Sequence, residues 1–390
     1  MRYNDPMFGI YLGRKRELIV AVADVSGGSV GLAIIVPTKR GPARVLAAER
    51  APLTYSDPAG VASIGSQIRT VGEKLNKSYS AHSPKGGVPT ELFVILHSQI
   101  ARSKVSRVES KYSKETTITD RHISDMAAKI LESERDIDTS SLFEASVIRT
   151  ELNGYPTSIP TKKRVTRLAV STLLSEVTHE VRRDIEIAFQ QTFPHLVPVF
   201  RSATRASVSV LAEIMGESQD YVVIDIGGGG STITVIREGI AVESQSVNEG
   251  TRQIVSRIAG TGMPEEALSM MRMLAREQCS DPACDAIRVS MVSAEPELVK
   301  MFGEAISKCV SNRRLPNTLL LIAHPDLATW LSRFFTRIDF AQFTLTTQPF
   351  EVRNILAKDF SKIIAPGDVV GLDPSLALSC ALVNIEKASA

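Results

Sequence analysis

The sequence lacks any hydrophobic run long enough to cross a membrane. A membrane-spanning helix needs about 18 or more consecutive apolar residues, and even the apolar stretch Leu18–Val25 is interrupted by Asp24. The amino-terminal residues also lack the order of charged, apolar and small residues that marks a secretion signal. We therefore expect a cytoplasmic protein without a membrane span.

Cysteine is scarce, and its spacing does not suit a metal. The four cysteines lie in the last third of the chain, without a Cys-x-x-Cys pair or a histidine at ligand spacing. They are Cys279, Cys284, Cys309 and Cys380. This pattern argues against a structural zinc site and predicts free, buried thiols in a reducing compartment. The six histidines are scattered, and we assign none of them to a metal.

An excess of charge of one sign is also missing. Lys and Arg total 45 and Asp and Glu total 43, which leaves a net charge of +2 and no chain-wide field to hold a polyanion. The densest basic cluster, Lys162–Arg164 with Arg167, has no interleaved aromatic residues on which bases could stack. We expect a solvated turn at this cluster and no nucleic-acid partner.

What the sequence contains is the composition and patterning of a large α/β protein. Hydrophobic residues make up 43% and charged residues 23%, and 390 residues suit two domains. Strand and helix patterns alternate along the first half of the chain. We expect helices at 61–75, 118–131 and 175–192, strands at 91–97, 146–152 and 196–200, and a loop at 77–89. The patterns between Val88 and about Val170 predict a small α+β insertion.

Two segments in different halves of the chain share one design. Glu17–Val36 reads ELIVAVADVSGGSVGLAIIV, and Tyr221–Ile240 reads YVVIDIGGGGSTITVIREGI. In each segment, two apolar runs flank a glycine-rich turn that starts with an aspartate, which is typical of a β-hairpin. The chain is therefore expected to hold one such hairpin in each half.

A glycine turn of this kind can hold a phosphate group. Without a Cβ atom, backbone N–H groups approach a ligand closely and converge into an anion-binding nest. An aspartate at the start of the turn, here Asp24 or Asp225, can hold a hydrated Mg²⁺ that bridges phosphate oxygens. Either hairpin alone is more often a turn without a ligand. One hairpin in each half favours a shared phosphate site.

The two hairpins resemble the phosphate motifs of the actin-like ATPase superfamily, and within it those of the bacterial FtsA and PilM proteins. The first hairpin resembles the phosphate 1 motif, Asp-Ile-Gly-Ser-Ser-Ser-Val-Lys, and the second resembles the phosphate 2 motif, Asp-Ile-Gly-Gly-Gly-Thr-Thr-Asp. Residues 152–155 (LNGY), 250–259 (GTRQIVSRIA) and 371–378 (GLDPSLAL) resemble further segments of these proteins. The insertion also lies between the hairpins, where FtsA and PilM carry subdomain 1C.

The resemblance implies an actin-like α/β fold with two domains built from ribonuclease-H-like halves. Domain I would comprise residues 1–87 and 171–202, subdomain 1C residues 88–170, and domain II residues 203–370. Residues 371–390 would form the closing helix of domain I. The two hairpins would then face each other across a cleft.

The resemblance also implies ATP and Mg²⁺ as cofactors between the hairpins. The phosphate-binding residues would be Ser26, Gly27, Gly28, Gly227, Gly228, Gly229, Gly230, Ser231 and Thr232. Asp24 and Asp225 would hold Mg²⁺, and Gly250, Ala323 and His324 would lie on the adenosine side. No other metal site is expected.

Several positions depart from the family pattern. Gly31 replaces the terminal lysine of phosphate 1, and Ser202 falls where relatives often carry a glutamate that positions the attacking water. His324 places a side chain where the backbone should approach the purine and ribose. Leu268 and Met271 fall where a glutamate and a lysine usually cradle the base. We expect a retained fold with weakened or lost ATP binding and very slow hydrolysis, and we assign no catalytic residue.

The resemblance favours a cytoplasmic scaffold that docks to the tails of inner-membrane proteins. Because the amphipathic carboxy-terminal anchor of FtsA is not found, a PilM-like role in type IV pilus assembly is favoured over an FtsA-like division protein that polymerises at the membrane. An active ATPase or a sugar-kinase-like phosphotransferase of the same fold stays open. Self-association also stays open, as does contact with the inner face of the cell membrane through the apolar and basic segment Phe8–Arg16.

Overall fold

The chain builds two large β-sheets with the same strand order. The computed structural model describes residues 17–51, 53, 64–82, 87–216, 219–279, 282–310, 313–365, 369 and 371–389. In the first sheet, β3, β2 and β1 form an antiparallel meander, and β4 and β9 continue it in parallel. In the second sheet, β12, β11 and β10 form the meander, and β13 and β14 continue it in parallel. The short β15 pairs with β3 at the edge of the first sheet.

The strand bounds place each glycine turn between the first two strands of its sheet. The first sheet contains β1 (Val20–Ser26), β2 (Ser29–Val36), β3 (Ala43–Arg50), β4 (Glu91–Leu96), β9 (Pro198–Ser202) and β15 (Ile364–Ala365). The second contains β10 (Tyr221–Ile226), β11 (Ser231–Arg237), β12 (Ile240–Val247), β13 (Thr318–Ile322) and β14 (Glu351–Asn354). Both expected hairpins are therefore present. Each half has the ribonuclease-H-like order.

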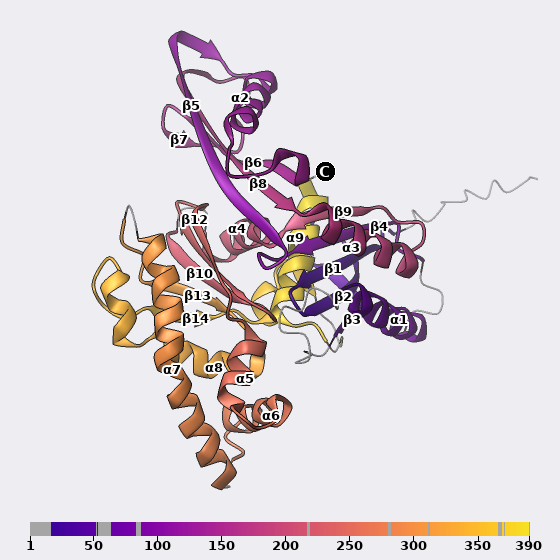
Figure 1. Cartoon of the computed structure of the whole chain (residues 1–390). Helices are drawn as coiled ribbons and strands as arrows, with labels where there is room; N and C mark the ends of the chain where they lie inside the picture. Colours follow the sequence, from indigo (N-terminus) through magenta and orange to yellow (C-terminus); the bar gives the residue numbers. More distant parts are fainter. Residues whose placement is uncertain are drawn as a thin grey trace, which may run out of the picture.

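Helices lie between the two sheets and on their outer faces (Figure 1). Buried side chains of α4 and α9 pack between the sheets, α1 and α3 cover the outer face of the first sheet, and α5 to α8 cover the outer face of the second. The bounds are α1 (Ile64–His82), α3 (His179–Thr192), α4 (Ala203–Met215), α5 (Thr251–Ala259), α6 (Pro264–Ala275), α7 (Pro282–Cys309), α8 (Pro325–Phe335) and α9 (Pro374–Ser389). Short 3₁₀ helices span Thr139–Ser141, Ile338–Phe343 and Ala357–Phe360.

This layering explains why the central strands are apolar on both faces. Successive side chains of a strand point to opposite faces, and in β1 the inner face carries Val20 and Val22 while the outer face carries Ala21 and Ala23. Asp24 falls on the inner face by the same alternation and is nonetheless buried. A carboxylate in such a place requires partners.

The insertion between the hairpins is a separate four-stranded sheet that projects from the body (Figure 1). Its strand order is β5, β8, β6, β7. The bounds are β5 (Ala101–Thr117), β6 (Leu142–Leu152), β7 (Tyr155–Pro156), β8 (Arg164–Val177) and α2 (Asp120–Ser133). One face of the sheet packs against α2 through a small core that includes Met126, Leu168 and Val170.

The domain boundaries differ from those expected from the sequence. Strand β4 pairs with β1 in the first sheet, so the insertion begins after β4 rather than at Val88, and β8 carries it to Val177 rather than to about Val170. The chain also returns to domain I before residue 371, because β15 (Ile364–Ala365) pairs with β3 of the first sheet. Strand and helix patterns locate the elements in the sequence, but the strand with which each one pairs determines the domain to which it belongs.

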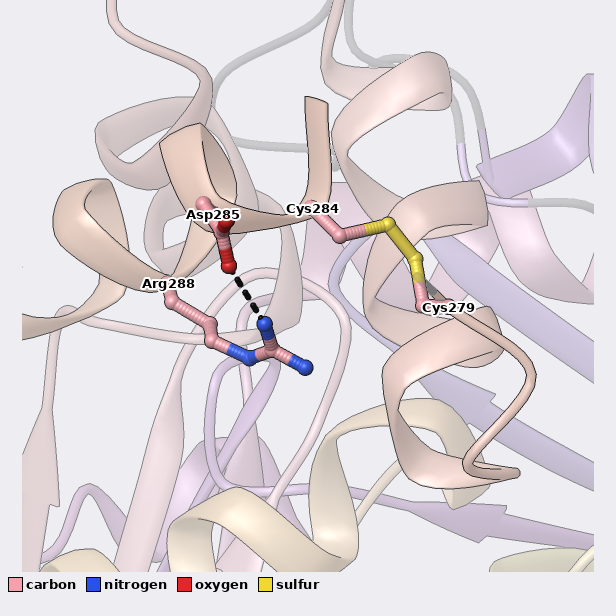
Figure 2. The surroundings of a disulfide bond; sticks show 4 residues. All are labelled: Cys279, Cys284, Asp285 and Arg288. Carbon is pink, nitrogen blue, oxygen red and sulfur yellow. Dashed lines mark hydrogen bonds and ion pairs between the residues drawn. A yellow bond between two sulfur atoms is a disulfide. The ribbon is translucent and has the colours of Figure 1, made fainter. Parts of the chain in front are cut away.

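The cysteine expectation is wrong for one pair. Cys279 and Cys284 form a disulfide, with Cα atoms 6.1 Å apart, between the segment that follows α6 and the first turn of α7 (Figure 2). Asp285 and Arg288 form an ion pair of 2.6 Å on the same turn (Figure 2). The two helices bring the cysteines within bonding reach, which spacing alone did not indicate. Cys309 and Cys380 are buried and free, as expected.

Within the described residues, none of the helices combines the length and the hydropathy that a membrane span requires. The segment Phe8–Arg16, which was considered for membrane contact, lies outside the described residues.

Candidate nucleotide cleft

The two glycine turns face each other, as the sequence predicted. A Cβ atom added to Gly228 would lie 2.8 Å from the carbonyl oxygen of Gly27, so the turns are in direct contact. Gly28 has a φ of +78° and lies against the guanidinium group of Arg252, where an added Cβ would meet Nη1 at 2.1 Å. Only glycine fits these places.

A cavity of about 520 Å³ opens beside the two turns. Six of the predicted site residues line it, namely Ser26, Asp225, Gly227, Gly228, Ala323 and His324. Asp24, Ser231 and Thr232 are buried behind its wall, with exposed fractions of 1%, 0% and 8%. Gly250 packs on the second turn, where an added Cβ would lie 2.2 Å from the amide nitrogen of Gly230.

Asp24 is held by four side chains of this protein. Its Oδ1 accepts from His97 Nε2 at 2.7 Å, from Ser379 Oγ at 2.8 Å and from Ser375 Oγ at 3.2 Å. Its Oδ2 accepts from Arg50 Nη2 at 2.5 Å. Burial would raise the pKa of Asp24, but His97 and Arg50 hold it well below its usual range. Both oxygens of this carboxylate are therefore engaged.

His97 bridges the carboxylates of the two phosphate turns. Besides Asp24, it contacts Asp225, with Nδ1 3.1 Å from Oδ2. Burial alone would lower the pKa of His97, but the two carboxylates raise it to about 10. The ring is therefore an imidazolium ion at neutral pH, and both nitrogens donate. One buried cation links domain I to domain II between the two aspartates predicted to hold Mg²⁺.

Arg50 occupies the place that the missing lysine left open. It lies opposite Gly31 in the β2–β3 register, and a Cβ on Gly31 would lie 2.6 Å from Arg50 Nη2. The guanidinium group also pairs with Asp373 at the start of α9 and donates to Ser29 Oγ at 2.9 Å. Burial would lower the pKa of Arg50, but Asp373 and Asp24 raise it. A cation from the neighbouring strand therefore lies over Gly31, and it is already paired with Asp24 and Asp373.

These contacts do not fit a hydrated Mg²⁺ at Asp24. Mg²⁺ requires near-octahedral oxygen ligands and keeps several of its waters, whereas the oxygens of Asp24 already accept hydrogen bonds from two cations and two hydroxyls. Asp225 contacts the imidazolium of His97. Among the described residues, no group of three or more His, Cys, Asp or Glu is arranged to hold a metal ion.

The second turn is tied to neighbouring segments. The amides of Thr251 and Arg252 at the start of α5 donate to the carbonyls of Gly227 and Gly228 at 2.8 and 3.0 Å. A helix amino terminus often binds phosphate through such amides, but here they serve the turn itself. From domain I, Gln99 Nε2 donates to Gly230 O at 2.8 Å and Ser98 bonds to Thr232.

The adenosine side also differs from the expected pattern. His324 caps α8, where its Nδ1 accepts from the amide of Asp326 at 3.3 Å, and burial lowers its pKa. Met271 is buried in the domain II core rather than facing the cavity. The neighbouring Arg272 lines the cavity instead and pairs with Asp326 at 2.8 Å.

Ser202 lies at the base of the insertion. It caps α4 through a hydrogen bond to the amide of Arg205, and its hydroxyl donates to Glu144 Oε2 at 2.7 Å. Glu144 is buried and also pairs with Arg205 at 3.3 Å. At the position where relatives often carry the water-positioning glutamate, this chain joins domain I to the insertion.

Sequence reasoning missed Arg50, His97, Arg272 and Asp373. One signal was available for His97. The strand expected at 91–97 ends at this residue, and neighbouring parallel strands bring their carboxyl ends to the same edge of a sheet. His97 could therefore have been placed beside Asp24. The other three follow no spacing rule.

No family model matches the sequence, and no curated protein matches it. Among solved structures, the PilM-PilN type IV pilus biogenesis complex is similar over 95% of this chain and 98% of that chain, with a TM-score of 0.58 and 14% identity. The ethanolamine utilization protein EutJ from Carboxydothermus hydrogenoformans is similar over 93% and 90%, with a TM-score of 0.47 and 13% identity. A Bacteroides thetaiotaomicron protein with an actin-like ATPase fold covers 88% and 94%, with a TM-score of 0.39 and 9% identity.

The similarity to the PilM-PilN complex and the repeated strand order of the two sheets indicate the same fold. The chain has an actin-like α/β fold, with two ribonuclease-H-like domains and an inserted α+β subdomain.

Proposed function

We propose that this protein is an actin-like scaffold that docks the cytoplasmic tail of an inner-membrane protein, as a PilM-like component of a pilus or secretion assembly. In this proposal it works in the cytoplasm at the inner face of the membrane, and its cleft is closed by its own side chains rather than by Mg-ATP. The observation that carries the proposal is the buried bridge from Asp24 through His97 to Asp225.

The charge balance of the cleft supports a site without nucleotide. Three cationic side chains that line the cavity are already paired with carboxylates of the protein. Arg50 pairs with Asp24 and Asp373, His97 with Asp24 and Asp225, and Arg272 with Asp326. A triphosphate enters a site favourably when positive charge is free to face it, and these three cations face carboxylates instead.

The same contacts support the proposed loss of hydrolysis. Phosphoryl transfer depends on positioning and on charge placed around the γ-phosphate, and each such group commonly contributes about 10²–10³ in rate. Arg50 is engaged with two carboxylates, and Ser202 is engaged with Glu144. A scaffold role therefore suits the cleft better than turnover.

The docking role is supported by the similarity to the PilM-PilN complex, which covers nearly the whole chain. That structure is a complex of type IV pilus biogenesis. The proposal extends this pairing to a tail from this protein's own host.

Calorimetry and an ATPase assay on the full chain test the closed cleft. We expect no Mg-dependent ATP binding and no turnover, because Mg²⁺ would have to displace His97 and Arg50 from Asp24. Asp225→Ala and the control Asp285→Ala, whose side chain is 76% exposed, should both behave like the parent. Robust Mg-dependent turnover that disappears only in Asp225→Ala would make the protein an enzyme.

Crosslinking in host cells tests the docking. We expect capture of an inner-membrane protein, and a synthetic peptide of its cytoplasmic tail should bind the purified full chain with an affinity that Mg-ATP does not change. Capture of soluble proteins alone, or a tail affinity that depends on ATP, would contradict the proposal.

A further inference from the structure

The far end of the inserted subdomain gathers basic residues that are separate in the sequence. We call this region the insertion tip and define it as residues 109–117 of β5 together with residues 153–167. Register pairs join its parts, because Lys111 lies opposite Arg167 and Thr117 lies opposite Arg164. The amide of Ile118 donates to the carbonyl of Lys163 at 2.9 Å, which fixes the 153–167 segment against the end of β5.

The tip carries an excess of positive charge that the whole chain does not have. Its basic side chains are Lys111, Lys114, Lys162, Lys163, Arg164 and Arg167, and its acidic ones are Glu109 and Glu115. The first two turns of the adjacent α2 add Arg121, Asp120 and Asp125. Seven basic side chains therefore stand against four acidic ones in this small region, whereas the complete chain has a net charge of only +2.

The acidic residues of the tip are matched by its arginines. Glu115 pairs with Arg164 at 3.5 Å and Glu109 with Arg167 at 4.0 Å. Arg121 pairs with Asp125 at 3.8 Å. The lysines Lys111, Lys114, Lys162 and Lys163 are exposed to solvent and supply the surplus.

Two large apolar side chains are exposed among these cations. Tyr155 is 77% exposed and Ile159 is 69% exposed. Lys163 Nζ donates to Thr157 Oγ1 at 3.1 Å, between them in the sequence. The guanidinium of Arg167 lies against Gly154, next to Tyr155, where an added Cβ would meet Nη2 at 2.3 Å. Cations and exposed apolar groups therefore share one end of the subdomain.

We infer that the insertion tip binds an anionic lipid membrane surface, with its lysines at the headgroups and Tyr155 and Ile159 in the interfacial layer. Basic side chains are attracted to anionic leaflets, and tyrosine prefers the membrane interface. The tip stands at an outer end of the molecule, away from the α6–α7 end (Figure 1), so it reaches a flat surface. A nucleic acid is less favoured, because stacking requires several aromatic platforms and Tyr155 is the one exposed aromatic side chain in the described tip.

Vesicle sedimentation with the full chain tests this inference. We expect binding to phosphatidylcholine vesicles that contain phosphatidylglycerol, weak binding to phosphatidylcholine alone, and release by salt. The variant Lys162→Glu/Lys163→Glu should bind the anionic vesicles at least about tenfold more weakly. Tyr155→Ser/Ile159→Ser should also reduce binding, because less apolar area enters the interface.

A matched control distinguishes vesicle binding by the insertion tip from a general effect of net charge. Lys300→Glu/Lys308→Glu makes the same change in charge on exposed positions of α7 and should bind like the parent. Equal binding of the tip variant and the parent would overturn the inference, as would binding to an oligonucleotide without binding to anionic vesicles. Tail docking and ATP binding are measured separately, so failure here leaves the proposed scaffold role standing.

Discussion

His97 is a buried cation that contacts one carboxylate from each domain, Asp24 and Asp225. Its folded pKa is raised to about 10 from 6.5, so the stability it contributes is fully present below pH 6.5 and is lost as the pH rises through 10. The free energy of unfolding should fall by up to about 1.4 kcal/mol per pH unit between these values because of this group. Urea unfolding of the parent and of His97→Gln across this range measures the difference. A gap between the two proteins that does not change with pH would contradict this prediction.

Arg50 neutralises a buried carboxylate, and its removal should be costly. Arg50→Met leaves Asp24 without one cation in a place that is 1% exposed, and we expect a loss of about 3–5 kcal/mol in the free energy of unfolding. The control Arg44→Met breaks an ion pair whose side chains are 55% and 63% exposed and should change stability by about 0–1 kcal/mol.

A double variant distinguishes charge from packing at the same place. Adding Asp24→Asn to Arg50→Met removes the unpaired charge and should recover part of the loss, as measured by chemical denaturation. If the double variant is as unstable as the sum of the single changes, the ion pair is not the source of the effect.

At the scale of elements, the second glycine turn and α5 form one packed unit. Gly250→Ala would place a Cβ 2.2 Å from the amide nitrogen of Gly230, and the backbone would have to move. We expect a loss of about 1–3 kcal/mol, the range of overpacked cores, by thermal or chemical unfolding.

Gly303→Ala is the matched substitution in a helix. Nothing lies within 4 Å of an added Cβ at Gly303 in α7, so alanine should raise stability by about 0.5–1 kcal/mol through its helix propensity. If both glycine variants change stability in the same direction, the crowding at Gly250 is not the determinant.

For the whole molecule, the turn after β4 joins the domains. His97, Ser98 and Gln99 contact Asp225, Thr232 and Gly230 in that order. Gln99→Ala should therefore speed amide hydrogen exchange in the second glycine turn, since local opening needs fewer bonds broken. Gln342→Ala, on an exposed residue bonded within its own segment, should leave that turn unchanged. Equal protection of the amides of the second glycine turn in both variants would show that the contacts of Gln99 do not hold the two domains together.

The sequence determined the repeated hairpins, the apolar runs of their strands and the helices α1, α2 and α3, because these depend on local periodicity and on glycine. The meeting of the two turns was expected from the resemblance of the patterns around Asp24 and Asp225 to the phosphate motifs of actin-like proteins, and the two turns are in contact. The insertion was predicted, although β4 and the end of β8 were assigned to the wrong domain, because strand pairing is not visible in a single strand.

Tertiary structure alone decided what fills the cleft. Arg50 lies 26 residues from Asp24 in the sequence and His97 lies 73 residues from it, and no periodicity relates them. Gly31 appeared as a lost cation in the sequence, whereas the fold places Arg50 from the neighbouring strand over that glycine. The order of the strands and the packing of the two domains bring these charged side chains together. A sequence motif therefore shows which charged groups are present, and only the folded chain shows whether they are already paired.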